Sequence, residues 1–265
     1  FNRSYVRVVS QNQLFLYQTY SVMYAIFVKE LNSFFSSLTG LIVAIAFLVV
    51  NGLFIWVFPG ELNVLDGGYS TLDTLFIIAP WVFLFLVPAI AMRSFSEEKK
   101  TGTIELLLTR PISDLQLVLG KYFAAVVLVL ITLLPSLVFF LSVYLLGNPV
   151  GNIDTGGTWG SFIGLFFLAA GYAAISIFAS SLTQNHIISF IIGVVLSFLL
   201  YTGLDSLASL YVFRDIQHII VSFGINEHYA SLSRGVVDSR DIVYFIGLAT
   251  FFVLATRMVL QSRKW

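Results

Sequence analysis

Six long apolar stretches constrain this chain more than any other feature of its sequence. A helix needs about 20 apolar residues to cross the hydrocarbon core of a bilayer. The stretches are continuous and do not alternate apolar with polar residues as barrel strands do. We expect six transmembrane helices, the third long enough to tilt or to project from the bilayer. The predicted spans are Leu38–Phe58, Thr74–Met92, Leu115–Leu146, Trp159–Leu182, Ile187–Leu204 and Ile242–Leu260.

The composition agrees with an all-α membrane protein and excludes several other classes. The chain is 58% hydrophobic and 11% charged, which no soluble domain of this size matches. It contains no cysteine, and this removes disulfides and thiolate metal sites. The middles of the six stretches hold no Asp, Glu, Lys, Arg or His, which argues against a carrier driven by an ion gradient.

Catalytic and nucleotide-binding motifs are also missing. His186, His218 and His228 lack metal-ligand spacing, and the pair Gly120–Lys121 lacks the glycines of a phosphate-binding P-loop. No nucleophile elbow occurs. We expect this chain to be no enzyme and to bind no metal or cofactor. The formal net charge of zero gives no reason to expect a nucleic-acid partner.

Lysine and arginine are distributed unevenly along the chain. With six spans, both termini share one side of the membrane with the loops after spans two and four. That side holds all but three of the 14 basic residues, the exceptions being Arg214, Arg234 and Arg240. Because positive charge accumulates on the cytoplasmic side, we expect both termini in the cytoplasm, together with a polar segment over residues 93–113.

The first 22 residues differ from a secretory signal, since they lack a charged start, an apolar run and a small-residue cleavage site. Met23 begins MYAIFVKEL, which is a more natural opening. Residues 1–22 are therefore either an extension that is not native or a genuine cytoplasmic tail. Residues 23–265 are expected to form a single transmembrane domain, because no repeat or linker divides them.

An amphipathic helix is predicted before the first span, over Met23–Leu38. Lys29, Asn32, Ser33 and Ser36 lie on its polar face, so the helix is expected to lie in the membrane interface and to meet span one in an elbow at Thr39–Gly40. The alternative is that it extends span one inside the protein. The expected apolar face consists of Met23, Tyr24, Phe27, Leu31, Phe34, Phe35 and Leu38.

Three prolines interrupt the predicted spans. Pro80 and Pro88 lie in span two and Pro135 lies in span three. Each removes a backbone donor and favours a kink, which neighbouring helices can accommodate in a membrane. Bending is the simpler interpretation, and a gate is the alternative.

A second amphipathic helix is predicted on the outer side, within the segment Asp205–Asp241 that joins spans five and six. Its polar side carries Arg214, Asp215 and His218. The pattern predicts a half-buried helix at the outer surface, either capping a pathway or shielding the ends of the spans. Its apolar face would consist of Val212, Phe213, Ile216, Ile219, Ile220 and Phe223.

The polar segment between spans two and three contains signals for a short helix. Ser94 and Glu97 have capping-box spacing, as do Ser113 and Gln116 before span three. Gly102 loosens the backbone, Thr103 can cap a helix over Ile104–Thr109, and Arg110–Pro111 ends it. This helix has only about two turns and is marginal alone in water. Its three leucines, Leu106 to Leu108, need a cover, which could be headgroups, neighbouring spans or a docked protein.

This segment resembles the corresponding cytoplasmic segment of ABC-2 family ABC transporter permeases, whose pattern is E-x-x-x-G-T-x-E-x-L-L-x-x-P followed by a Gly-Lys at the next span. The likeness extends to MYAIFVKEL, to six spans and to FGINEHYASLSRGVVDSRDIVYF before the last span. More narrowly, the chain is similar to the permease associated with gliding motility in Bacteroidetes. The matching residues are Glu98, Gly102, Thr103, Glu105, Leu107, Leu108, Pro111, Gly120 and Lys121.

The resemblance implies that the short helix is a coupling helix docked on a separate ATP-binding subunit, which holds ATP and Mg. Glu105 and Leu106–Leu108 would make the contact with this subunit, and Thr103 would belong to the same interface. Gly102 and Pro111 would set the angle of the coupling helix. Arg110 would pair with the ATPase or with lipid phosphate, and Phe27, Lys29, Glu30 and Leu31 would belong to the elbow helix.

A second permease chain, identical or related, and a location in the inner membrane are also implied by the resemblance. The expected function is export coupled to ATP hydrolysis. One alternative is a scaffold that uses ATPase cycling mechanically in motility or secretion machinery, and another is a channel or passive facilitator.

Overall fold

The computed structural model describes residues 23–36, 38–108 and 113–262. Within these ranges no residue lies in a β-strand. Six helices there are long and apolar enough to cross a membrane, which confirms the predicted fold class. They are Gly40–Val57, Asp73–Lys100, Asp114–Leu146, Thr155–Leu182, His186–Ala208 and Ser239–Gln261.

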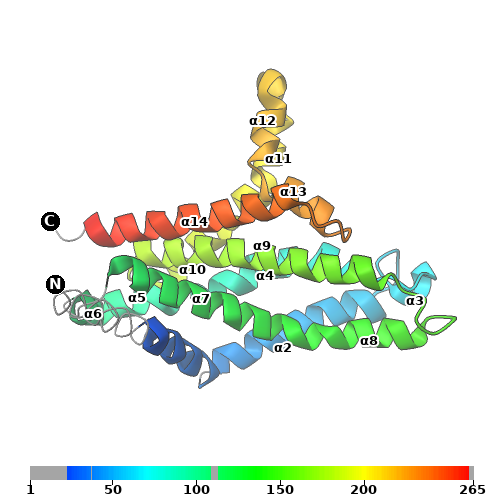
Figure 1. Cartoon of the computed structure of the whole chain (residues 1–265), viewed down its shortest axis with the longest axis horizontal. Helices are drawn as coiled ribbons and strands as arrows, with labels where there is room; N and C mark the ends of the chain where they lie inside the picture. Colours follow the sequence, from blue (N-terminus) through cyan, green and yellow to red (C-terminus); the bar gives the residue numbers. More distant parts are fainter. Residues whose placement is uncertain (1–22, 37, 109–112, 263–265) are drawn as a thin grey trace, which may run out of the picture.

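The spans form one elongated bundle, with α3 (Val64–Gly67) at one end and α6 (Thr103–Leu108) at the other (Figure 1). We call these the α3 end and the α6 end. Span one consists of α2 (Leu38–Gly52) followed by one π-helical turn, η1 (Leu53–Val57). Helix α9 (Thr155–Leu182) is the most buried span. Its main neighbours are α4 (Asp73–Ala91), α10 (His186–Phe198) and α14 (Ser239–Gln261).

Small residues explain why α9 can occupy the centre of the bundle. Its sequence is rich in Gly, Ala and Ser, which let neighbouring backbones approach closely in a membrane protein. A Cβ added at Gly160 would lie 2.4 Å from the carbonyl oxygen of Gly235, in the loop before α14. A Cβ at Gly164 would lie 2.6 Å from the Cβ of Leu232. Larger residues at these two positions would therefore force the elements apart.

Span two continues beyond its predicted boundary. Helix α4 is followed directly by α5 (Arg93–Lys100), and the N–H of Met92 donates to the carbonyl of Pro88 across the junction. The polar residues after the apolar run thus extend the same helix. The predicted capping box of Ser94 and Glu97 is wrong, because Ser94 lies inside this continuous helix and meets no free helix end.

The prolines differ in their local structure. Pro80 and Pro88 are buried inside α4, which continues through both. Pro135 lies in a 3-10 turn, η2 (Leu134–Ser136), between α7 (Asp114–Leu133) and α8 (Leu137–Leu146). Span three is longer than a crossing requires, as expected, since its 33 residues rise about 50 Å against a core of about 30 Å. A gating role for the prolines stays a prediction.

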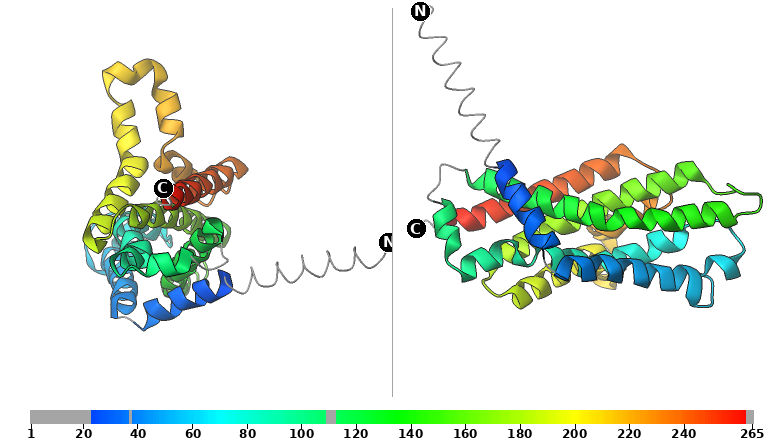
Figure 2. Two further views of the ribbon diagram at one scale, coloured as in Figure 1. Left: turned by 90° about the vertical axis from the view of Figure 1, so that its left-hand side faces the viewer. Right: turned by 90° about the horizontal axis from the view of Figure 1, so that it is seen from below.

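Residues 23–35 form a helix that lies across the direction of α2, in agreement with the predicted elbow (Figures 1 and 2). We call it the elbow helix. It ends in a turn at Ser36, which is earlier than the predicted elbow at Thr39–Gly40. Gly40 lies directly against Phe34, because a Cβ added at Gly40 would be 2.6 Å from the Phe34 ring.

The packed face of the elbow helix differs from the predicted apolar face. Tyr24 and Phe35 are exposed, at 66% and 59%, whereas Ile26, which the predicted face left out, is only 7% exposed. The helix packs on the protein with Met23, Ile26 and Glu30 rather than with its most apolar stripe. Hydropathy could not identify this face, because Glu30 becomes half-buried only through an ion pair with another span.

The outer segment is not the single half-buried helix that the sequence predicts. After α10 comes a π-helical turn, η3 (Leu199–Gly203), then α11 (Leu204–Ala208), a 3-10 helix η4 (Tyr211–Ile216) and α12 (Gln217–Ser222). Helices α11 and α12 stand away from the side of the bundle as an arm (Figures 1 and 2). No residue of η4 or α12 is buried, because this arm meets no other part of the described chain near its tip. Helix α13 (Ile225–Leu232) then returns to the bundle.

Candidate coupling site

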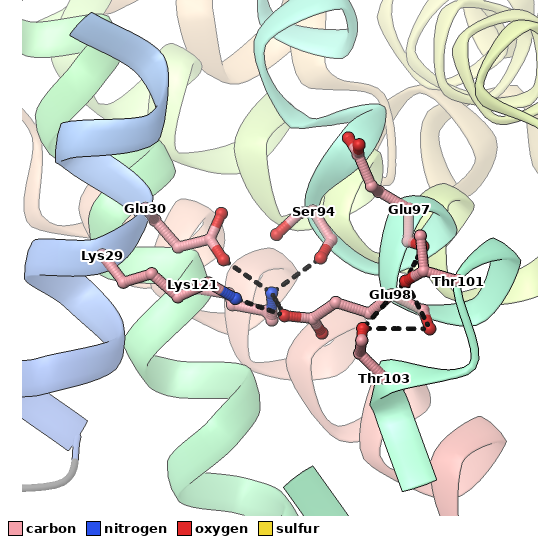
Figure 3. A network of polar contacts seen from close by, with 8 residues as sticks. All are labelled: Lys29, Glu30, Ser94, Glu97, Glu98, Thr101, Thr103 and Lys121. Atoms are coloured by element: carbon pink, nitrogen blue, oxygen red, sulfur yellow. Dashed lines mark hydrogen bonds and ion pairs between the residues drawn. The ribbon is translucent and has the colours of Figure 1, made fainter. Parts of the chain in front are cut away.

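A buried lysine forms the centre of a charged cluster near the α6 end of the bundle. Lys121, in the second turn of α7, is only 1% exposed. Its Nζ donates to Glu30 Oε1 at 2.7 Å, to Glu98 Oε1 at 2.9 Å and to the carbonyl of Ser94 at 2.6 Å (Figure 3). Because burying an unpaired charge is costly, these three acceptors are what allow the lysine to lie inside the protein.

The cluster joins three separate elements. Glu30 comes from the elbow helix, Glu98 from α5 and Lys121 from α7, so the charges connect the elbow helix to spans two and three (Figure 3). The preceding residue, Gly120, allows the close approach, because a Cβ there would lie 3.3 Å from Ile26 Cγ2. We call Lys29, Glu30, Glu98 and Lys121 the junction cluster.

Lys29 adds a second, more exposed ion pair to the junction cluster. Its Nζ lies 3.0 Å from Glu98 Oε1, and its side chain is 60% exposed. Partial burial lowers the pKa of Lys29, but the hydrogen bond to Glu98 and the negative charges of Glu98, Glu30 and Glu97 outweigh it, so this pKa is raised above its ordinary value. Glu98 therefore bridges one buried and one exposed lysine.

The connection from α5 to α6 is short and well defined. Gly102 has φ +71°, a left-handed conformation that glycine adopts without steric cost. The Thr101 hydroxyl donates to the carbonyl of Glu97 at 2.8 Å and lies 2.9 Å from the Thr103 hydroxyl (Figure 3). The turn between α5 and α6 therefore has a backbone conformation that suits glycine, and the role of Gly102 in setting the angle of α6 stays a prediction.

Helix α6 begins at Thr103, one residue before the predicted start, and runs to Leu108. The Thr103 hydroxyl donates back to the carbonyl of Glu98 at 3.4 Å, so it interacts with the end of α5. Ile104 is buried and Glu105 is exposed, which places Glu105 on the free side of the first turn. Leu106 to Leu108 are helical, but their side chains lie outside the described residues, as do Arg110 and Pro111 entirely.

The far side of α5 is fixed to the junction between spans four and five. Lys99 Nζ donates to the carbonyl of Ser181, and Ser96 Oγ lies 2.6 Å from His186 Nδ1. Helix α5 is therefore held on one side by α7 and the elbow helix and on the other by α9 and α10.

The start of α7 is capped as predicted. Ser113 and Gln116 form the capping box there.

A polar cavity of about 380 Å³ lies beside the junction cluster, lined in part by Lys29, Glu30, Glu97 and Thr101. The described part of the chain contains no group of three or more His, Asp or Glu side chains that could hold a metal ion. The ion pairs of the junction cluster connect the elbow helix, α5 and α7, an arrangement that suits mechanical connection.

The sequence does not predict the pairing within the junction cluster, although all four residues lie in segments that it singles out. Glu98 and Lys121 belong to the pattern that resembles ABC-2 permeases, and Lys29 and Glu30 belong to the expected elbow helix. Because Lys121 lies near the end of an apolar stretch, the sequence predicts that its side chain extends to the membrane interface. This expectation is wrong, since Lys121 is only 1% exposed. The pairing of Lys121 with Glu30 required the folded chain.

Comparison with known proteins agrees with this architecture. Residues 7–233 match the family model described as ABC-2 family transporter protein. No curated protein matches the chain. The matched range includes the elbow helix, the junction cluster and the first five spans. The chain therefore belongs to the ABC-2 transporter family and is a multi-pass membrane permease component of an ABC transporter.

Proposed function

We propose that this permease couples ATP hydrolysis on a separate ATP-binding subunit to export of a substrate, and that α6 is the coupling helix. ATP and Mg would be bound by the partner, and this chain itself would catalyse no reaction. An ABC-2 permease in general works with an ATP-binding subunit. The specific assignment of α6 is supported by its place at one end of the bundle, at the tip of span two (Figure 1).

The observation that carries the proposal is the bridging position of Glu98. Its carbonyl accepts from Thr103 in α6, and its carboxylate accepts from Lys121 in α7 and from Lys29 in the elbow helix. A push on α6 would therefore reach span two directly and span three and the elbow helix through ion pairs. A flexible loop at this place could not pass a displacement to three elements at once.

Glu105 and the three leucines after it would form the contact with the ATP-binding subunit. Glu105 is exposed on the first turn of α6, so its carboxylate is accessible to a partner protein. Thr103 and Gly102 would hold the angle of α6, with Pro111 at its other end. Arg110 would pair with the ATPase or with lipid phosphate.

We further propose that the α6 end faces the cytoplasm and that the protein lies in a cell inner membrane. A second permease chain would complete the transporter. The arm supports this last point, because Tyr211 and Val212 are each 84% exposed although they are large and apolar. On its resemblance, the complex would serve gliding motility or an associated secretion process.

The test is the substitution Glu105→Lys in the complex with its ATP-binding subunit. We expect membrane insertion to be retained and stimulation of the ATPase to be lost, because the reversed charge would oppose docking of α6. Glu61→Lys, an equal change at an exposed residue of the α3 end, should leave stimulation unchanged. Full stimulation in Glu105→Lys would contradict the proposal.

A reconstituted complex separates export from the mechanical alternative. Sealed vesicles that hydrolyse ATP and move labelled cargo support export. Vesicles that have the same ATPase activity but move none of the labelled compounds extracted from the source cell would instead favour a scaffold that uses the ATPase cycle mechanically.

A further inference from the structure

A small cavity lies between α4, η3 and α13, away from the junction cluster. Its volume is about 290 Å³, which is near the lower limit of ~300–1,000 Å³ for sites that bind drug-sized ligands. It borders the first turns of α4, so it belongs to the half of the bundle nearer the α3 end (Figure 1). A cavity of this size suits a small molecule or the headgroup of a larger one.

The cavity lies where span five departs from α-helical geometry. Tyr201 and Thr202 line it from η3, the π-helical turn over Leu199–Gly203. Such turns are rare and occur often at functional sites, because the extra residue displaces side chains from their regular positions. Here the turn sets Tyr201 against Trp81 of α4, with ring centroids 5.5 Å apart in an edge-on arrangement.

Aromatic rings form much of the wall. Trp81 is 44% exposed and lies at the rim, whereas Phe76, Tyr201 and Tyr229 are buried deeper. The faces of such rings attract cations, most strongly those of tryptophan and tyrosine. No Lys, Arg or His lines the cavity. Arg234 donates from Nε to the carbonyl of the lining residue Ala230 at 3.0 Å, but its side chain is exposed, so solvent screens its charge.

The hydrogen-bonding groups of the wall offer acceptors. The Tyr229 hydroxyl donates to the carbonyl of Phe76 at 2.8 Å, and the Ser233 hydroxyl donates to the carbonyl of Ala230 at 3.1 Å. Asn226 donates from Nδ2 to Asp205 Oδ2 at 2.9 Å. The hydroxyls of Tyr229 and Ser233 therefore keep oxygen lone pairs as acceptors, and Asn226 keeps its Oδ1 acceptor together with the second N–H of its Nδ2.

A carboxylate behind the wall gives the site its charge. Asp205 lies four residues after Tyr201 and contacts the lining residue Asn226. Its second oxygen, Oδ1, is buried and has no hydrogen-bond partner among the described residues, and no basic side chain there forms an ion pair with it. Asp205 is half-buried and does not itself line the cavity, so its charge acts on a bound cation from behind Asn226.

We propose that this cavity binds an organic ammonium group, held by cation–π contacts to Trp81 and Tyr201 and by the charge of Asp205. The ammonium can belong to a free amine or to a lipid headgroup. This site is independent of the coupling role of α6, since binding requires neither ATP nor the partner subunit.

The test uses the full chain in nanodiscs of phosphatidylglycerol and labelled choline in equilibrium dialysis, with empty nanodiscs as the blank. We expect saturable binding of choline. Its neutral isostere, 3,3-dimethylbutan-1-ol, should not displace it, because the isostere has the same shape without the charge. Equal displacement by the isostere, or no saturable choline binding, would overturn the proposal.

Variants locate the binding to this cavity. Asp205→Asn and Trp81→Leu should each weaken choline binding by roughly tenfold, whereas Trp81→Phe should retain most of it. The controls are Asp215→Asn in η4 and Trp159→Leu in α9, which should bind as the unmodified chain does. Thermal unfolding of each variant checks that it is folded. Unchanged binding in both folded cavity variants would overturn the proposal.

The source of the ammonium is decided by adding phosphatidylethanolamine to the nanodiscs. If this lipid lowers the apparent affinity for choline, the cavity takes a lipid headgroup. If the affinity is unchanged, the cavity takes a free organic cation. Both results support an ammonium site, and they assign it to different ligands.

Discussion

Lys121 Nζ of span three lies 2.9 Å from Glu98 Oε1 of span two in the interior of the bundle, and the same lysine pairs with Glu30 of the elbow helix. A membrane protein that places a charge here must keep it paired, because removing one partner leaves the other buried without compensation. The cluster therefore requires the three elements to stay together. It also lies one helical turn from the connection to α6, so it is placed to transmit movement.

Substitution of Lys121 by Met should destabilise the protein strongly. It leaves Glu98 and Glu30 without their buried partner, and breaking a buried pair costs about 3–5 kcal/mol. Thermal unfolding of the detergent-solubilised chain measures the effect. The triple variant Lys121→Met, Glu98→Gln, Glu30→Gln should recover much of the loss, because it removes the unpaired charges. A triple variant less stable than the single one would contradict this explanation.

Lys29 offers a matched comparison within the same cluster. In its ion pair with Glu98 the lysine side chain is 60% exposed, and pairs open to solvent contribute about 0–1 kcal/mol. We expect Lys29→Met to change the unfolding temperature little and to leave insertion intact. If Lys29→Met and Lys121→Met destabilised the protein equally, burial would not be what makes the cluster important.

Gly102→Ala should impair coupling more than stability. The left-handed conformation at φ +71° costs a residue with a side chain about 1–2 kcal/mol, so alanine would favour a different angle for α6. The measurement is stimulation of the ATPase in the assembled complex. Gly247→Ala is the control, since Gly247 lies within α14 at an ordinary helical φ with no atom near its added Cβ. Normal stimulation in Gly102→Ala would show that this angle does not matter.

Gly160→Ala should loosen the contact between α9 and the loop before α14. The added Cβ would overlap the backbone of Gly235, and overpacking of this kind typically costs about 1–3 kcal/mol. Gly156→Ala, four residues earlier, meets no such contact and should be tolerated. Equal unfolding temperatures for the two variants would mean that the backbone of Gly235 moves freely.

Long apolar segments made the spans predictable, because crossing a bilayer imposes a length and a composition that few other structures share. Local chemistry also sufficed at Gly102, where the backbone conformation needs glycine, and at Ser113 and Gln116, whose side chains cap a real helix end. The failure at Ser94 and Glu97 has the opposite cause. The same spacing occurred inside a helix that continues from span two, so there was no end to cap.

Long-range pairing and packing could not be predicted in this way. Glu30 looks like an exposed residue of an amphipathic helix until Lys121, 91 residues later, is placed beside it. The outer residues Val212 and Phe223 have the spacing of an apolar helical face, but their side chains remain 84% and 66% exposed. Their burial depends on what surrounds the arm and not on its own sequence.

Crosslinking from Glu105 tests the coupling role of α6 most directly. The chain contains no cysteine, so Glu105→Cys carries a single thiol to which a short photoreactive crosslinker can be attached. Glu61→Cys at the α3 end is the matched control. In the native complex, we expect a crosslink from residue 105 to the ATP-binding subunit and none from residue 61. An intact complex in which residue 105 reacts only with lipid would contradict it.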